Sequence, residues 1–96
     1  MRPSDILREK RAEVLKIAEK YGLKNLRVFG SIARGEDDEK SDVDLLVEFS
    51  PGFTLFRYAA LIREMEETLG LKVDIVSQNK IKIRYRDAVL EEAVPL

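Results

Sequence analysis

The chain of 96 residues contains no cysteine, no histidine and no tryptophan. Without cysteine it has no disulfide, no zinc finger and no thiol nucleophile. Without histidine, a Ser-His-Asp triad, a histidine general base and histidine-ligated metals are excluded. Any catalysis must therefore use carboxylates, hydroxyls, lysine, arginine and cations that prefer oxygen ligands.

The sequence also lacks a long apolar run and an excess of basic charge. No segment approaches the roughly 20 apolar residues of a membrane-spanning helix, and the chain does not begin with a secretory apolar region. With 17 basic and 18 acidic residues the net charge is −1, which provides no general basic field for nucleic acid or membranes. We therefore expect a soluble cytoplasmic protein.

The length predicts one domain over 1–96 with a single thin core. Charged residues make up 36% of the chain, against about 25% in typical proteins. Asparagine and glutamine together occur only three times. This composition is typical of thermophilic proteins, and an unfolding midpoint in the mesophilic range would contradict a thermophilic source.

Hydrophobic periodicity and the positions of glycine and proline divide the chain into elements of an α/β (α+β) fold. In order they are a helix over 4–21 with Ser4 as N-cap, a strand over 26–29, a helical turn over 31–35, a strand over 42–49, a helix over 54–69 and a strand over 72–76. The segment 80–86 alternates like a strand, but a helix over 81–93 is favoured because the helical pattern continues beyond it.

The connections between these elements predict the topology. The 54–69 helix is long enough for a right-handed crossover between two parallel strands. The shorter connection between the first two strands permits an antiparallel pair. We therefore expect a small mixed sheet of three or more strands with helices packed on one face.

Three aspartates fall on one face of this predicted sheet. Asp42 and Asp44 alternate with apolar residues, and they lie about 6.6 Å apart at about 3.3 Å per residue. Asp74 has the same orientation in the third strand. If the second and third strands are neighbours, they lie about 4.8 Å apart. Crowded carboxylates favour a compensating cation, and Mg²⁺ fits their oxygen ligands. The alternative is that Asp42 and Asp44 are solvated residues on an exposed face.

Gly30-Ser31 follows the first strand and begins the helical turn. Glycine lets the backbone approach a phosphate closely, helix-start N–H groups attract anions, and the Ser31 hydroxyl is a further donor. Such a dipeptide alone is usually only a turn. Together with the aspartates it predicts a phosphoryl-transfer site whose geometry suits two metal ions.

Gly30-Ser31, ten intervening residues and Asp42-Val43-Asp44 resemble the signature of the DNA polymerase beta-like nucleotidyltransferase superfamily. The runs FGSIARGE at 29–36 and SDVDLLV at 41–47 resemble its minimal nucleotidyltransferase branch, which is MntA-like. VDIV at 73–76 matches the place where that family carries its third acid. The resemblance covers nearly the whole chain and implies the polymerase beta-like palm fold.

The resemblance implies a role for each matching residue. Gly30 and Ser31 would hold the terminal phosphates of the nucleotide, and Asp42 and Asp44 would bind both Mg²⁺ ions. Asp74 would complete the catalytic metal site and help to deprotonate the attacking hydroxyl.

Arg34 lies in the same motif and would bind phosphate charge. The alternative is that Arg34 is a surface partner of the acids at 36–39, which are themselves expected to form a solvated connection.

The implied reaction transfers a nucleoside monophosphate, AMP from ATP, to a hydroxyl and releases pyrophosphate. The implied acceptor is a tyrosine of a partner HEPN-domain ribonuclease toxin, which makes the chain the antitoxin of a type VII toxin–antitoxin pair. A chain of this length offers no acceptor domain of its own, so we expect the acceptor on a partner protein.

Two alternatives stay open besides the transferase. One is a non-catalytic antitoxin or assembly module that works by binding alone, although a pure binder has no reason to concentrate three acids. The other is nucleic-acid binding through the basic and aromatic segment 80–86, which the overall acidity opposes. A homodimer or hetero-oligomer is equally open, because Phe53, Phe56 and the 94–96 end are core, dimer contact or partner contact.

Overall fold

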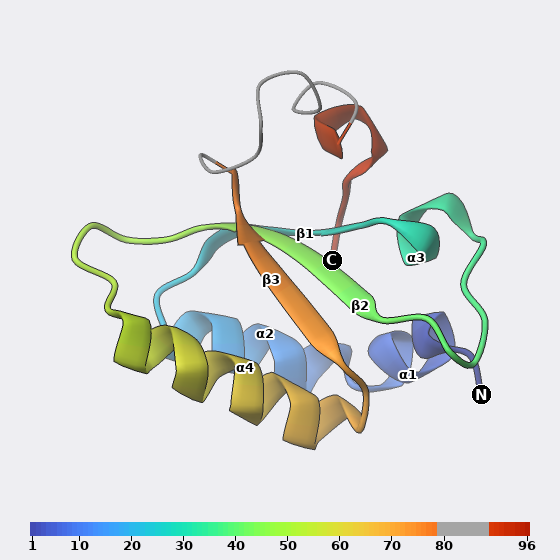
Figure 1. Cartoon of the computed structure of the whole chain (residues 1–96), viewed down its shortest axis with the longest axis horizontal. Coiled ribbons are helices and arrows are strands. Elements are labelled where there is room, and N and C mark those ends of the chain that lie inside the picture. The colour runs from blue at the N-terminus through green and yellow to red at the C-terminus, as the bar shows by residue number, and fades with distance from the viewer. Residues whose placement is uncertain (79–88) are drawn as a thin grey trace.

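The computed structural model describes residues 1–78 and 89–96. Its elements are α1 (Pro3–Glu9), α2 (Arg11–Lys20), β1 (Lys24–Phe29), α3 (Ser31–Arg34), β2 (Val43–Glu48), α4 (Leu55–Leu69), β3 (Val73–Ser77) and β4 (Val94–Pro95). Figure 1 shows α1, α2 and α4 on one face of the sheet and the helical turn at 89–92 on the other. The expected α/β fold with helices packed on one face is confirmed.

The four strands lie in the order β3-β2-β1-β4. β1 and β2 are antiparallel, β2 and β3 are parallel, and α4 forms the crossover between them, as predicted. β4 was not expected; its two residues pair antiparallel with β1. Val94 and Pro95 therefore belong to the sheet edge, where proline is tolerated.

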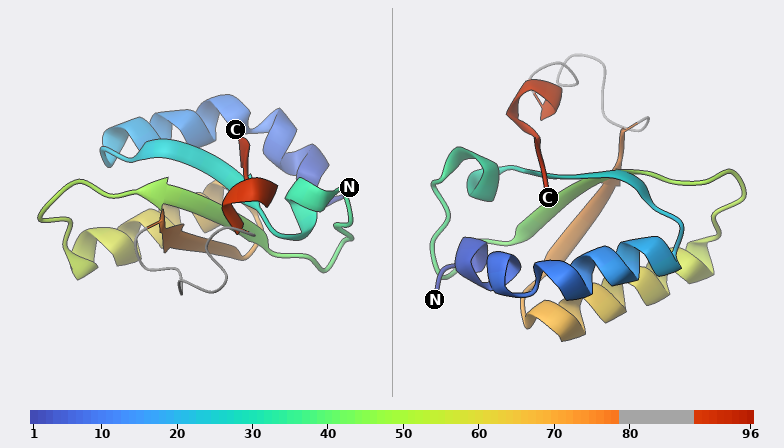
Figure 2. Two further views of the ribbon diagram at one scale, coloured as in Figure 1. Left: turned by 90° about the horizontal axis from the view of Figure 1, so that it is seen from above. Right: turned by 180° about the vertical axis from the view of Figure 1, so that it is seen from behind.

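The hydrophobic core lies between the sheet and the helices, and Figure 2 shows α2 and α4 side by side beneath the strands. Alternate residues of β2 and β3 are buried there, as a period of two predicts. The buried residues from both layers include Val14, Ile17, Val28, Val43, Leu45, Val47, Leu61, Met65, Leu69, Val73 and Ile75.

Leu46 shows that the face of the sheet opposite the helices is covered over part of its length. It lies on the same face as Asp44, two positions further along β2, and is fully buried. The helical turn at 89–92 stands on this face (Figure 1). Asp44, by contrast, is half-buried and Asp74 is exposed, so the accessible part of this face is the end that carries them.

The helix predicted over 4–21 is divided into α1 and α2 at Lys10, whose φ of −97° and ψ of 12° leave the helical region. Ser4 is not the N-cap: Arg2 occupies that position, and Ser4 lies inside α1. The backbone N–H of Ser4 instead donates to Oδ2 of Asp37 at 2.9 Å. Asp5 accepts from the N–H of Arg2 at 3.2 Å, so the start of α1 is capped partly by a local side chain and partly by Asp37, which is distant in sequence and which local periodicity does not reveal.

Asp37 also corrects the expectation that the acids at 36–39 form a solvated connection. Its side chain is fully buried, and Oδ1 lies 2.7 Å from Nη2 of Arg2. Burial by itself raises the pKa of Asp37, but the hydrogen bonds from Ser4 and Arg2 outweigh it and hold the pKa below its usual value. Asp37 therefore ties the loop between α3 and β2 to the start of α1.

Two side chains of α4 occupy the outer edge of β3. The hydroxyl of Tyr58 donates to the carbonyl of Ile75 at 2.8 Å. Oε2 of Glu66 accepts from the N–H of Val73 at 3.0 Å. Backbone groups that an added strand would need are therefore already bonded, which protects this edge from pairing with another chain.

The predicted helix over 81–93 and the basic segment 80–86 lie mostly or wholly at 79–88, outside the described residues. Within the described part, 89–92 are helical, and the N–H of Ala93 donates to the carbonyl of Val89 at 2.9 Å. Across 1–78 and 89–96, every helix is too short or too polar to cross a membrane.

We expect Asp37→Asn to lower the free energy of unfolding at neutral pH by about 1–3 kcal/mol, because it weakens hydrogen bonds to a buried charge. The folded-state pKa of Asp37 is depressed, so this stabilisation is complete above the ordinary value of 3.8 and is lost as the pH falls through the folded-state pKa. Urea unfolding of both proteins should therefore converge in acid. The exposed Glu39→Gln is the control, and a pH-independent difference would contradict the assignment.

Candidate active site

The sheet places Asp44 directly beside Asp74. β2 and β3 pair residue for residue in a parallel ladder, with Asp44 opposite Asp74, and such strands lie about 4.8 Å apart. Both side chains point to the face opposite the helices, as predicted. Asp42 immediately precedes β2 and is exposed. The three predicted acids thus gather at one end of the sheet.

The electrostatics of Asp44 reflect this crowding. Burial raises the pKa of Asp44, and the charges of Asp74 and Asp42 raise it further, whereas the guanidinium of Arg34 partly opposes them. Like charges that share a small volume disfavour ionisation in this way. A cation bound between these carboxylates would relieve their repulsion.

Gly30 is the residue that lets Asp44 occupy its place. Its φ of 76° and ψ of −151° lie in a region that only glycine populates readily. Phe29 pairs with Asp44 across the antiparallel ladder, so Gly30 follows immediately beside that carboxylate. A Cβ at Gly30 would overlap Oδ2 of Asp44 and come within 3.2 Å of its Cγ.

Ser31 begins α3 and is half-buried beside this contact. Three backbone hydrogen bonds hold the turn: Arg34 N–H donates to the Gly30 carbonyl at 3.2 Å, Gly35 N–H to the Ile32 carbonyl at 3.1 Å and Glu36 N–H to the Ser31 carbonyl at 2.9 Å. Both residues of the predicted phosphate-binding dipeptide therefore lie next to the carboxylates.

Arg34 is bound on two sides by carboxylates. Its Nε lies 3.0 Å from Glu36, and its Nη1 lies 3.0 Å from Glu92. The alternative prediction, that Arg34 pairs with the acids at 36–39, is thus confirmed for Glu36. The sequence did not predict the pair with Glu92. The charge of Arg34 also acts on Asp44 and partly lowers its pKa, so Arg34 lies near the candidate site. Its contact with a nucleotide stays a prediction.

The donor chemistry of the three aspartates fits a hard divalent cation such as Mg²⁺. In residues 1–78 and 89–96, however, no three potential ligand side chains already converge on one point. Mg²⁺ commonly uses one or two carboxylates and completes its shell with water and substrate phosphates. The residues therefore fit Mg²⁺ that is bound together with a phosphate ligand.

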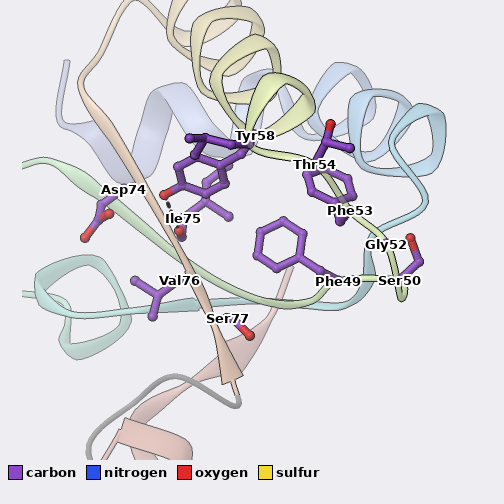
Figure 3. A pocket seen from close by; sticks show the side chains of 11 residues that line it. Phe49, Ser50, Gly52, Phe53, Thr54, Tyr58, Asp74, Ile75, Val76 and Ser77 are labelled. Atoms are coloured by element: carbon purple, nitrogen blue, oxygen red, sulfur yellow. Dashed lines mark hydrogen bonds between the residues drawn. The ribbon is translucent and has the colours of Figure 1, made fainter.

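A pocket of about 580 Å³ lies against β3 beside Asp74 (Figure 3). Its walls include the rings of Phe49, Phe53 and Tyr58, with centroids 4.7 Å apart for the two phenylalanines and 6.0 Å apart for Phe49 and Tyr58. Burial and the charge of Asp74 raise the pKa of Tyr58. Sequence reasoning did not assign these aromatic residues to the site; the sole signal is the pair of phenylalanines around the turn at 50–52.

We expect Asp44→Asn to raise the thermal unfolding midpoint by a few degrees in the presence of EDTA. Burial and the charges of Asp74 and Asp42 together raise the pKa of Asp44, and the neutral amide removes both effects, so the folded state loses an unfavourable charge. Differential scanning calorimetry with and without chelator measures the change. A lower midpoint than wild type in EDTA would show that the carboxylates do not repel one another.

The chain matches the family described as "Nucleotidyltransferase domain" over residues 9–96. It is 41% identical over 88 residues to "Putative protein adenylyltransferase MJ0435" of Methanocaldococcus jannaschii, covering 92% of this chain and 95% of the relative. It is 40% identical over 78 residues to "Protein adenylyltransferase MntA" of Thermococcus cleftensis, covering 81% of this chain and 79% of that protein.

Solved structures agree with these sequence matches. One described as a "putative minimal nucleotidyltransferase" superposes with a TM-score of 0.86 at 47% identity, over 97% of this chain and 95% of the other. A crystal structure of a toxin–antitoxin with AMP-PNP contains the same fold at 19% identity, with a TM-score of 0.75 over 88% of this chain and 69% of that one. The chain is therefore a nucleotidyltransferase and belongs, as its motifs predicted, to the minimal, MntA-like branch of that family.

Proposed function

We propose that the protein is a Mg²⁺-dependent protein adenylyltransferase that transfers AMP from ATP to a tyrosine of a HEPN-domain ribonuclease toxin and thereby acts as its antitoxin. The observation that carries this proposal is the placement of Asp44 beside Asp74 and against the bare backbone of Gly30. Relatives named as protein adenylyltransferases support a protein acceptor. The similar toxin–antitoxin structure with AMP-PNP supports a toxin partner and an adenine nucleotide.

In the proposed reaction the acceptor hydroxyl oxygen attacks the α-phosphorus of ATP. A new P–O bond forms, the bond from the α-phosphorus to the bridging oxygen breaks, and pyrophosphate leaves with that electron pair. The carboxylate of Asp74 takes the proton of the hydroxyl. Two Mg²⁺ ions, held by Asp42 and Asp44 with Asp74 completing one site, would supply positive charge to the entering and leaving oxygens.

The terminal phosphates would lie at the turn between β1 and α3. The Ser31 hydroxyl and the first N–H groups of α3, which have no acceptor within the helix, donate to phosphate oxygens there. Arg34 would exchange a carboxylate partner, Glu36 or Glu92, for a phosphate oxygen. We also propose that 1–96 acts as one catalytic domain whose acceptor lies on a second protein.

Incubation of the protein with the HEPN-domain protein encoded beside it, ATP and Mg²⁺ should increase the intact mass of that partner by AMP units. Asp44→Ala and EDTA should each abolish the increase, because both remove the metal-binding charge. Intact-mass spectrometry measures the transfer. If the mass never rises while Asp44→Ala still neutralises the toxin, the protein acts by binding alone and the enzymatic proposal is wrong.

Gly30→Ala should reduce AMP transfer by at least about 100-fold, because the added Cβ displaces the carboxylate of Asp44. It should also lower the free energy of unfolding by about 1–3 kcal/mol through backbone strain. Gly22→Ala is a suitable control, since Gly22 also has a positive φ (+69°), but an added Cβ there would have no neighbour within 4 Å. A folded Gly30→Ala protein with wild-type transfer would contradict the role of this contact.

A further inference from the structure

We infer that the pocket beside β3, together with the exposed Leu55 and Phe56, is the docking surface for the acceptor protein. A large apolar side chain of the partner fills the pocket, and the neighbouring acceptor residue brings its hydroxyl to Asp74. This inference rests on the proposed AMP transfer and adds the surface that selects the acceptor.

The direction of attack identifies the occupant. In an in-line displacement the entering and leaving oxygens lie on opposite sides of the phosphorus. The sheet arranges the candidate groups in a row, with Ser31 after β1, Asp44 on β2 and Asp74 on the outer strand β3. If the terminal phosphates lie at Ser31, pyrophosphate leaves toward β1 and the hydroxyl enters from the side of β3. The pocket lies on that side (Figure 3).

The surface around the pocket has the character of a protein contact. Leu55 and Phe56 are 82% and 91% exposed at the start of α4, and Leu55 lines the pocket. Large apolar side chains exposed beside an apolar hollow mark interaction sites. Apart from the carboxylate of Asp74, the described lining residues are uncharged, so the described lining itself favours an apolar protein side chain over a phosphate. The nearby guanidinium of Arg57 already lies over the Phe53 ring, 4.8 Å from its centroid.

The form of the partner segment follows from the edge of β3. Tyr58 and Glu66 already bond to backbone groups of this edge, so the partner is recognised through side chains and not by strand addition. Figure 3 shows the aromatic rings on one side of β3 and the carboxylate of Asp74 turned to the other. The segment must therefore cross the strand, with an apolar anchor on the ring side and the hydroxyl at Asp74.

The double variant Leu55→Asp/Phe56→Glu tests this surface. Both residues are exposed in the first turn of α4, where acidic side chains are favourable, so the fold is preserved. We expect at least about a 30-fold loss in affinity for the HEPN-domain protein and in kcat/KM for AMP transfer. The Kd for ATP with Mg²⁺ should not change.

Ala12→Asp/Lys16→Gln is the matched control. It lowers the net charge by the same two units at exposed positions of a different helix, α2. Partner affinity, transfer and ATP binding should all stay at wild-type values in this control. Isothermal titration calorimetry and intact-mass kinetics provide the three measurements.

The outcomes separate the docking surface from the proposed function. Wild-type binding and transfer in the double variant would overturn the docking surface and leave AMP transfer standing. Partner binding that needs Leu55 and Phe56 without any AMP transfer would overturn the proposed function and support the surface. A wild-type protein that neither binds nor modifies the partner would overturn both. Loss of a homodimer in sedimentation with transfer intact would assign the surface to a second copy and overturn the inference.

Discussion

The parallel pairing of β2 with β3 is the constraint on which the site depends. Val43, Leu45, Val73 and Ile75 must face the helices, and burying each such side chain is worth about 1.5–3 kcal/mol. Two carboxylates 4 Å apart repel by about 1–4 kcal/mol in water or near a protein surface. The core therefore outweighs the repulsion, and a shift of register by one residue, which would bury the acids, is excluded.

Gly30 has a second role that the sequence motif alone does not predict. The sequence indicates a glycine for close phosphate approach and, separately, an aspartate for metal binding. In the structure the missing Cβ of Gly30 also makes room for the carboxylate of Asp44. Both residues of the motif therefore depend on one contact between the end of β1 and the start of β2.

The order of elements and the positions of the predicted site residues follow from short-range patterns. Alternation in β2 and β3 suffices to place Asp44 and Asp74 on one face, and α4 suffices to make their strands parallel. The errors involve contacts between distant segments: Asp37 caps α1, and Glu92 pairs with Arg34. Such contacts depend on which surfaces meet after folding, so a sequence pattern within ten or twenty residues does not predict them.

The bonds that Tyr58 and Glu66 make to the edge of β3 have a consequence for how the surface can diverge. Side chains of α4 itself already bond this edge, so at the proposed docking surface a few exposed positions such as Leu55 and Phe56 would discriminate between partners. These positions contribute little to the core, so they can change without loss of folding. After duplication, two copies of such a chain can therefore come to bind different partners while both keep the same catalytic residues.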